Sequence, residues 1–474
     1  MSGSANDQGT SVLEQYTIEQ IPESERHGRP RDLFFVWFAS NIMPLTIITG
    51  ALAAAVFGLS FWWSVVAIVV GNLAGGLFMA LHSAQGPRLG VPQMIQSRAQ
   101  FGVVGATLVI ILSILMYVGF FASNLILGGL FTHSFASGIS VNWGIVLSAI
   151  GSLVITIVGY DLIHAVNRYA SWVFGGAMLL TFILAVARGL PSDFFSAGGF
   201  SGGPFLAMLS IAALWQIAYA PYVSDYSRYM PSDEGVRPTF WMSYWGCTIG
   251  SILPMVLGVV VALAVSGDTT AGIHTIGGGA AWLILLIFAL GIIDTNVLNV
   301  YSALLCLITV GQTFSHRWLP GAGARTVTAT GMIGVSLILA LAFQSNFLNN
   351  YVNFILLLLY VLIPWTAINL VDYYLIRKGD YNVSAFFERT GGIYGRMNWV
   401  GLSVYLVGIV VEIPFVNTTL YQGPVSKALN GADLAWLVGL AVTIPLYYFA
   451  AKRFAAGPMV AVRTVPVDVG GPHA

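Results

Sequence analysis

The chain has 474 residues, of which 57% are hydrophobic and 8% charged, with a mean hydropathy of +0.82. Soluble domains carry about 25% charged residues, so this composition excludes a water-soluble globular protein and indicates that lipid surrounds most of the chain. The net charge of +0 argues against nucleic acid as a partner. The two cysteines, Cys247 and Cys306, lie in apolar segments, where they fit neither a metal site nor a disulfide framework.

In chain order, a polar tail at residues 1–32 comes first, and it lacks the apolar core and cleavage site of a signal peptide. Twelve apolar segments follow, each long enough as a helix to cross about 30 Å of hydrocarbon. They cover residues 33–58, 60–82, 102–131, 142–159, 167–190, 204–224, 239–266, 281–312, 326–345, 350–376, 398–417 and 434–451. A second tail covers residues 452–474. We therefore expect an all-α integral membrane protein with twelve transmembrane helices.

The placement of Lys and Arg predicts the orientation of these helices. With the N-terminus in the cytoplasm, seventeen of the 19 basic residues fall in cytoplasmic segments, and only Arg188 and Lys427 fall outside. Cytoplasmic loops of membrane proteins carry such an excess. We expect an integral protein of the plasma (inner) membrane with both termini in the cytoplasm.

Two prolines interrupt apolar segments at corresponding places. Pro44 lies in the first segment and Pro221 in the sixth, five segments later, each among small or polar residues. A proline removes a backbone donor and crowds the preceding turn. Because the separation is an odd number of spans, two repeats at residues 33–190 and 204–376 would have opposite topology, with residues 398–451 adding two helices. Paired breaks in inverted repeats predict a transporter site at the membrane midplane, whereas a lone proline is typical of a tolerated kink.

The third segment carries a stripe of polar and aromatic residues. Ser113, Tyr117, Phe120 and Asn124 follow one another at the spacing of a single helix face. An amide beside aromatic rings suits a flat heteroaromatic ligand, because the rings stack and the amide reads the donor–acceptor edge. Packing against neighbouring helices is the alternative interpretation.

The eighth segment holds the most informative residue, Asp294. A carboxylate in the middle of a span is costly and usually functional, so we expect a coupling or substrate role for it, against a structural hydrogen bond. Polar or small residues share its side of the helix, with Asn296 at the margin: Gly291, Thr295, Asn299 and Ser302. Glu412, near the end of the eleventh segment, lies outside both repeats and is interpreted equally well as a structural partner or a dimer contact.

Four blocks of sequence resemble the nucleobase–cation symporter family, the purine–cytosine permeases. They are GRPRDLFFVWFASNIMPLTIITGAL, GPRLGVPQMIQSRAQFG, APYVSDYSRYMP and PWTAINLVDYYLIRKGDY. The resemblance extends over essentially the whole chain. It implies a leucine-transporter-like fold with five-plus-five inverted repeats and two additional C-terminal helices. It also implies secondary active import of a nucleobase, cytosine or a purine, by cation symport.

The resemblance also implies a substrate site between spans 3, 6 and 8. The matching positions are Tyr117, Phe120, Asn124, Trp215, Gln216, Asn296 and Asn299. At the position where relatives have the stacking ring of span 6, this chain has Gln216, with Trp215 one residue earlier. Asp225 and Arg228 match the family's span 6 exit, where helix termination and a cytoplasmic gate or ion pair are expected.

Sodium-coupled relatives hold Na⁺ between carbonyls of the broken first helix and hydroxyls of span 8. The matching residues of this chain are Ala39, Ile42, Gly291, Asp294 and Thr295. Asp294 stands where such relatives usually have serine or threonine. A carboxylate there either strengthens a sodium site or carries the coupling proton itself after desolvation, and burial without a basic partner favours the proton.

Several alternatives remain open at this level. Hydantoin, allantoin, a thiamine-precursor pyrimidine or a nucleoside are alternative substrates. A channel is disfavoured because it needs a continuous polar pore. An enzyme is disfavoured because the seven histidines are scattered over tails and span ends. We expect no cofactor other than the coupling ion, membrane lipid as the surrounding partner, and a monomer.

Overall fold

The computed structural model describes residues 18–158, 160–233, 235–265, 268–315 and 322–454, apart from the side chains of 157, 158, 160–171, 294 and 322. Every named element in these ranges is a helix. The main helices are α1 (Pro30–Asn41), α2 (Pro44–Ala55), α3 (Phe61–Ser83), α6 (Ala106–Phe135), α7 (Val141–Val158), α8 (Tyr160–Ala187), α9 (Gly202–Ile217), α10 (Val223–Ser227), α11 (Val236–Ala264), α13 (Ala281–Phe314), α14 (Ala322–Phe343), α15 (Phe347–Val371), α16 (Trp399–Glu412) and α18 (Ala435–Phe454). Each of the twelve predicted segments overlaps one of these helices or, in the first and sixth, a pair of them.

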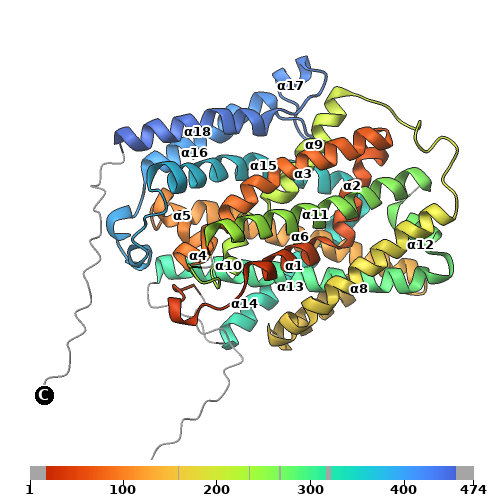
Figure 1. The fold of residues 1–474 in the computed structure, drawn as a ribbon, viewed down its shortest axis with the longest axis horizontal. Coiled ribbons are helices and arrows are strands. Elements are labelled where there is room, and N and C mark those ends of the chain that lie inside the picture. Colours follow the sequence, from red (N-terminus) through yellow and green to blue (C-terminus); the bar gives the residue numbers. More distant parts are fainter. Residues whose placement is uncertain (1–17, 159, 234, 266–267, 316–321, 455–474) are drawn as a thin grey trace, which may run out of the picture.

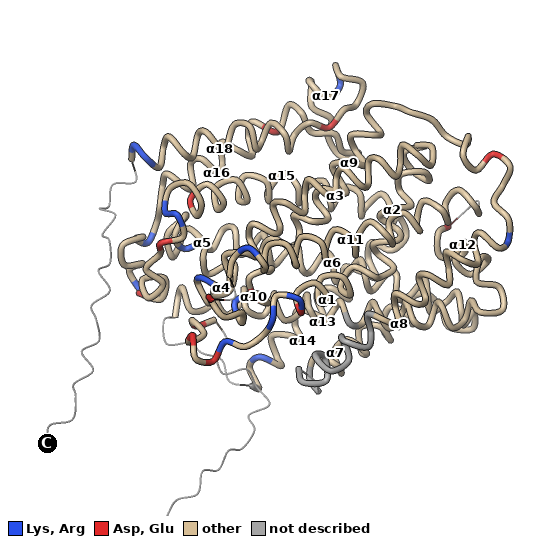
Figure 2. The backbone as a smooth tube through the Cα atoms, viewed as in Figure 1, with Lys and Arg blue, Asp and Glu red and all other residues tan. Residues whose placement is uncertain are grey.

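Shorter helices, which the sequence analysis did not predict, connect the main ones. They are α4 (Gly86–Leu89), α5 (Gln93–Phe101), α12 (Thr269–Gly277) and α17 (Pro424–Ala428). The main helices run roughly side by side along the long axis of the molecule, with α16 and α18 together at one edge (Figure 1). Helices α4, α5 and α10 lie at one end, and most Lys and Arg residues of the described chain gather there (Figure 2).

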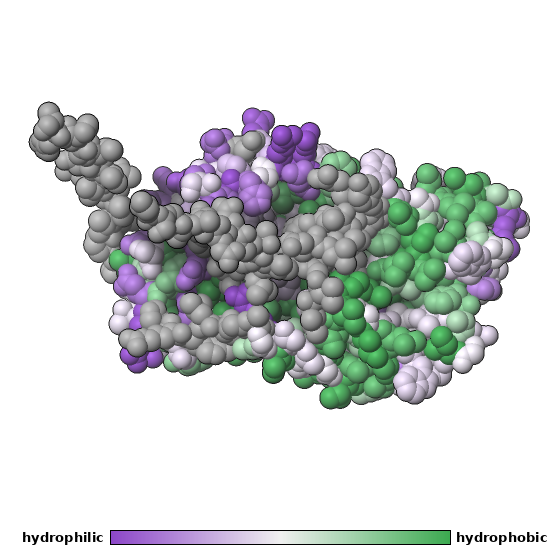
Figure 3. Space-filling model, turned by 90° about the horizontal axis from the view of Figure 1, so that it is seen from below, coloured by the Kyte–Doolittle hydropathy of each residue, from purple (hydrophilic) through white to green (hydrophobic). Residues whose placement is uncertain are grey.

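The surface of the described chain is that of a membrane protein. Hydrophobic side chains cover much of the visible face away from the polar end (Figure 3). Trp62, Trp143 and Trp282 lie at the starts of three long helices and are 61%, 64% and 60% exposed. Tryptophan is enriched where membrane helices meet the headgroup region, so these rings fit an interfacial belt.

Length and composition alone support fewer spans than the sequence analysis predicted. Six helical stretches of the described residues are long and apolar enough to cross a membrane, or seven if the bent α1–α2 pair is one span. Within the residues whose side chains are described, four further apolar helical stretches are shorter than that test requires: Val141–Thr156, Trp172–Ala187, Gly202–Ile217 and Trp399–Phe415. The molecule is therefore an all-helical membrane protein, and the number twelve stays a prediction.

Both predicted helix breaks are present. Helices α1 and α2 meet at an angle of 62°, with Ile42 and Met43 between them and Pro44 as the first residue of α2. Proline suits that position because a first-turn N–H has no intrahelical partner. In the sixth segment α9 ends at Ile217, and a turn that contains Pro221 leads into α10.

Close contacts between helix backbones hold these breaks together. A Cβ on Gly50 would lie 2.0 Å from the carbonyl oxygen of Met255, and one on Gly258 would lie 1.9 Å from that of Ile47, so α2 packs directly on α11. A Cβ on Gly75 would lie 2.1 Å from the carbonyl oxygen of Ala213. Small residues allow such approaches in membranes. Gly75 therefore allows α3 to pack closely against α9.

Candidate functional site

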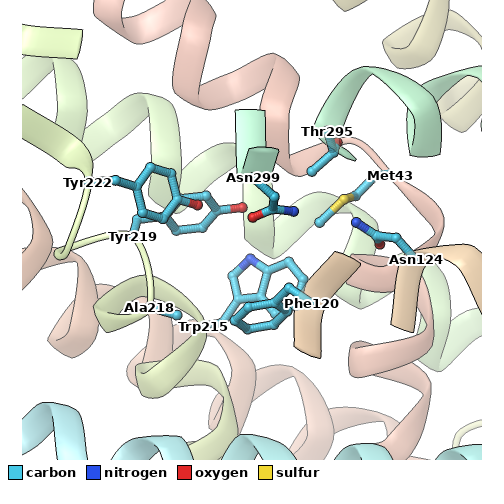
Figure 4. Close-up of a pocket in the computed structure, with 9 residues that line it drawn as sticks. All are labelled: Met43, Phe120, Asn124, Trp215, Ala218, Tyr219, Tyr222, Thr295 and Asn299. Carbon is cyan, nitrogen blue, oxygen red and sulfur yellow. The ribbon is translucent and has the colours of Figure 1, made fainter. Parts of the chain in front are cut away.

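A cavity lies where the two helix breaks face α6 and α13. It contains about 300 Å³ of empty space, part of it open to solvent. The α1–α2 break, the α9–α10 break, α6 and α13 all contribute to its wall (Figure 4). The residues that line it are Met43, Phe120, Asn124, Trp215, Ala218, Tyr219, Tyr222, Thr295 and Asn299.

Aromatic rings form one side of the cavity. Phe120 and Trp215 lie edge to face, with ring centroids 6.1 Å apart and an interplanar angle of 84°. Tyr219 and Tyr222 continue this wall into the α9–α10 turn, with centroids 5.5 Å apart. A flat ligand in this corner would meet one ring face and one ring edge, which is a favourable aromatic arrangement.

Asn41, at the end of α1, fixes the orientation of two of these rings. Its Oδ1 accepts hydrogen bonds from Trp215 Nε1 at 2.7 Å, from the Tyr219 hydroxyl at 2.9 Å and from Ser251 Oγ at 2.8 Å. Its Nδ2 donates to the carbonyl oxygen of Trp37 at 2.7 Å. Because Asn41 is fully buried, these bonds are shielded from water and tie both helix breaks to α11.

A chain of amides leads from the cavity into the bundle. Asn124 Nδ2 donates to Asn296 Oδ1 at 3.0 Å, and Asn296 Nδ2 donates to Ser152 Oγ at 3.2 Å. Asn124 Oδ1 is buried and has no hydrogen-bond partner in the part of the chain that the structure describes. Since an unpaired buried acceptor is costly, Asn124 offers a binding position for a ligand N–H.

Of the predicted coupling-ion residues, Thr295 lines the cavity, and Gly291 lies on the same helix, α13. A Cβ on Gly291 would lie 3.7 Å from the carbonyl oxygen of Ile42, so α13 faces the α1–α2 break at this point. Ala39 O is already bonded to the Ile42 N–H at 3.0 Å, and Thr295 Oγ1 donates to Gly291 O at 3.1 Å. Asp294 belongs to α13, but its side chain lies outside the described residues.

The structure brings only some of the predicted substrate residues to the cavity. Phe120, Asn124, Trp215 and Asn299 line it (Figure 4). The other three do not: Tyr117, Gln216 and Asn296.

Each of these three lies behind the wall. Gln216 Nε2 donates to Asn72 Oδ1 at 2.7 Å and to Ser251 Oγ at 3.0 Å, on the side of α9 that faces α3 and α11. Tyr117 packs against Tyr222, with ring centroids 5.4 Å apart. Asn296 supports the amide of the cavity residue Asn124.

Four lining residues were missed by the sequence analysis: Met43, Ala218, Tyr219 and Tyr222. Their place in the sequence could have identified them, because Met43 directly precedes Pro44 and the other three lie within three residues of Pro221. A break turns the backbone away from the helical path, so side chains beside it point into the space that the break creates. The helix-face argument used for the third segment does not extend into such turns.

The charges after Pro221 are buried at the polar end of the molecule. Asp225 is 2% exposed and accepts a hydrogen bond from the Gln93 N–H of α5 at 2.9 Å. Arg228 is fully buried and donates to the hydroxyls of Tyr229 and Tyr301, both at 3.3 Å. These contacts join α10 and the residue that follows it to α5 and α13.

Comparison with known proteins agrees with this arrangement. A family model described as "Permease for cytosine/purines, uracil, thiamine, allantoin" matches residues 20–439. The chain is 43% identical over 444 residues to the Bacillus subtilis protein named "Putative purine-cytosine permease YxlA", covering 93% of this chain and 96% of the relative. It is 25% identical over 452 residues to the purine-cytosine permease fcyB of Emericella nidulans, covering 90% and 86%. It is 24% identical over 454 residues to the hydantoin permease of Microbacterium maritypicum, covering 91% and 90%.

Solved structures share the fold. The inward-facing conformation of Mhp1 superimposes with a TM-score of 0.75 at 20% identity, covering 94% of each chain. A closed conformation of Mhp1 with bromovinylhydantoin bound gives the same TM-score and identity, covering 94% of this chain and 98% of Mhp1. The helix breaks and the cavity described above are therefore set in the architecture of that transporter.

Proposed function

The chain belongs to the family of permeases for cytosine and purines, uracil, thiamine and allantoin, and from that premise we propose that it imports a nucleobase by cation symport. It is a transporter and not an enzyme. The observation that carries the proposal is a cavity between two broken helices that combines aromatic rings with an unpaired amide oxygen. Cytosine and purines present the matching features, a flat ring and an edge of N–H donors and acceptors.

In this proposal each wall of the cavity has its own part in binding. Phe120 and Trp215 supply ring contacts, with Tyr219 as a further ring. Asn124 Oδ1 accepts a ligand N–H, and the Asn299 amide reads a second position of the edge. Gln216 and Asn296 act from behind the wall, through Ser251 and Asn124 respectively. Hydrogen bonds from these residues hold the binding side chains in place, which lowers the entropic cost of ordering them around the ligand.

The proposed transport cycle is alternating access around this cavity. We assign twelve transmembrane helices, with inverted repeats at residues 33–190 and 204–376 and two added helices at 398–451. The gathering of Lys and Arg at the end with α4, α5 and α10 supports a cytoplasmic location of that end and of both tails (Figure 2). Rocking of one repeat against the other would expose the cavity to each side in turn.

The coupling ion is assigned to the space between the α1–α2 break and α13. Ala39, Ile42, Gly291, Asp294 and Thr295 are the residues of this position. Proximity of the Ile42 carbonyl to Gly291 supports it. A proton carried by Asp294 is the preferred coupling ion, since a carboxylate in the middle of a membrane span is costly in its charged form. Na⁺ held by the same oxygen atoms is the alternative.

Uptake into proteoliposomes with proton and sodium gradients imposed separately tests this function. The wild-type protein should accumulate a labelled nucleobase when a proton gradient is applied at zero sodium. Asp294→Asn should abolish gradient-driven accumulation and keep exchange of labelled for unlabelled base, because a neutral amide cannot cycle a proton. Accumulation driven by sodium alone at fixed pH contradicts proton coupling and leaves Asp294 as a sodium ligand.

Substrate identity is tested in the same vesicles. Unlabelled cytosine, adenine, hypoxanthine, uracil, hydantoin and allantoin are added in turn as competitors. Competition by cytosine or a purine is the expected result. Hydantoin is the favoured second candidate, because this chain shares the fold of Mhp1, which has been solved with bromovinylhydantoin bound. Uptake without any exchange would contradict a carrier and favour a channel.

A further inference from the structure

A buried acidic cluster lies between α15, α16 and the start of α18, apart from the cavity and from the coupling position. Glu412, the last residue of α16, is 0% exposed, and neither of its carboxyl oxygens has a hydrogen-bond partner among the described residues. Asp433, two residues before α18, is 1% exposed. The transport mechanism proposed above uses neither residue.

The two carboxyl groups have opposite surroundings. Asp433 receives three hydrogen bonds, from the Tyr360 hydroxyl, from the Asn417 N–H at 3.1 Å and from the Ala435 N–H at 3.0 Å. Donors of this kind favour the ionised form of a carboxylate. No described residue donates a hydrogen bond to Glu412, so the charge of an ionised Glu412 would have no partner. Where environments separate two neighbouring carboxyl groups in this way, one is the anion and the other the neutral acid.

Packing around Glu412 leaves no room for a hydrated cation. A Cβ on Gly439 of α18 would lie only 1.8 Å from Glu412 Oε1 and 2.9 Å from the Ile363 side chain. One helical turn away, Thr443 of α18 lies close to Gly408 of α16, since a Cβ on Gly408 would lie 2.7 Å from Thr443 Oγ1. The Thr443 hydroxyl also has no hydrogen-bond partner among the described residues. The two helices therefore interlock through glycines, and the carboxyl group of Glu412 fills the contact.

The titratable groups that face Glu412 cannot neutralise it. They are Asp433 before α18, Tyr360 on α15 and Tyr405 on its own helix. None of the three carries a positive charge, and the negative charge of Asp433 adds repulsion. An unpaired charge buried at such a place is expensive, whereas a proton removes it.

We propose that Glu412 is a proton-binding site, separate from the coupling position in α13, and that its neutral form holds α16 and α18 together against α15. A proton is the one ligand that fits the glycine contact, since it needs no space of its own. Ionisation would force water or a counter-ion between α16 and α18 and so loosen this interface.

The cluster is connected to the cavity through α15. One side of α15 meets the cluster through Tyr360, whose hydroxyl is bonded to Asp433. The other side packs Phe354 against the cavity ring Phe120, with centroids 5.3 Å apart, and Tyr351 forms a 2.8 Å hydrogen bond with Thr49 of α2. Proton loss at Glu412 therefore acts on the helix that supports the substrate site.

Infrared spectroscopy of the purified protein tests the protonation state directly. A protonated carboxylic acid has its own carbonyl-stretch band, and wild-type protein at neutral pH should show it. Glu412→Gln should remove part of that band, and Glu388→Gln, which changes an exposed glutamate, should leave it unchanged. Asp294→Asn is measured alongside, so that any band from the coupling position is assigned separately. An unchanged band in Glu412→Gln overturns the proposal.

Unfolding by denaturant at several pH values provides the second test. Glutamate in an unfolded chain ionises near pH 4.3, whereas Glu412 in the folded protein keeps its proton, so unfolding releases one proton above that pH. The unfolding constant of wild-type protein should then rise relative to that of Glu412→Gln by about tenfold per pH unit from pH 5 upward. Asp433→Asn should destabilise the protein instead, because three hydrogen-bond donors would then face a neutral amide in place of a carboxylate.

If the unfolding constants of wild-type protein and of Glu412→Gln changed with pH in the same way, the proposal would be contradicted. Neither measurement uses a substrate or an ion gradient. A negative result here therefore leaves the proposed transport function untouched, and a failure of transport leaves the proton site untouched.

Discussion

Replacing Asn124 by alanine should weaken substrate binding strongly. The amide of Asn124 joins the cavity to the bundle, because Nδ2 donates to Asn296 Oδ1 at 3.0 Å while Oδ1 has no donor among the described side chains. Truncation removes the acceptor for a ligand N–H and also leaves Asn296 Oδ1 without its donor. Each loss leaves a polar group without its hydrogen-bond partner.

The magnitude follows from the cost of one unpaired polar group. An unsatisfied buried donor on the ligand costs about 1–3 kcal/mol, which corresponds to roughly 5- to 150-fold in the dissociation constant. The unpaired Asn296 is present in both the free and the bound protein. We therefore expect its effect mainly in the stability of the variant, and the binding constant should report the ligand contact alone.

Equilibrium binding of the best competitor from the uptake panel, labelled and added to purified protein, measures this loss. Ser113→Ala is the matched control, since Ser113 lies on the same helix and its hydroxyl is bonded to the Val109 carbonyl oxygen at 3.0 Å. The control should bind within about twofold of wild type, the scale of a change that touches no ligand contact. A well-folded Asn124→Ala protein with unchanged affinity would remove Asn124 from the substrate site.

Two further predictions separate packing from binding. Gln216→Met should lower the free energy of unfolding by about 1–3 kcal/mol, because Asn72 loses a buried hydrogen-bond partner, and it should change substrate affinity less than Asn124→Ala does. Denaturant unfolding measures the first effect, and the binding assay described above measures the second. A larger loss of affinity than that of Asn124→Ala would place Gln216 in contact with the ligand. Gly75→Ala should reduce the yield of folded protein, because the new Cβ would lie 2.1 Å from a backbone oxygen of α9. Gly331→Ala is the control and should keep the wild-type yield, because the new Cβ would lie in open space. Equal yields of monodisperse protein from the two variants in gel filtration would refute the close contact.

Much of the fold could be predicted because its determinants are local in the sequence. Each predicted apolar segment overlaps a helix, since hydrophobic side chains in lipid need a backbone that satisfies its own hydrogen bonds. Pro44 and Pro221 predicted the two breaks, because proline cannot donate within a helix. The short helices α5 and α12 escaped prediction, since they are too short to carry the hydropathy of a span.

The sequence by itself also determined which residue types meet at the site, but the tertiary structure decided which of them face the cavity. Trp215 and Gln216 are neighbours in α9, about 100° apart around the helix axis, so one lines the cavity while the other faces α3 and α11. Tyr219 lies in the turn after α9, where helical periodicity ends, so its direction could not be read from spacing. The environment of Glu412 depends on Gly439, which comes from another helix. Proximity between distant segments, and the loss of solvent that it causes, is what only the folded chain determines.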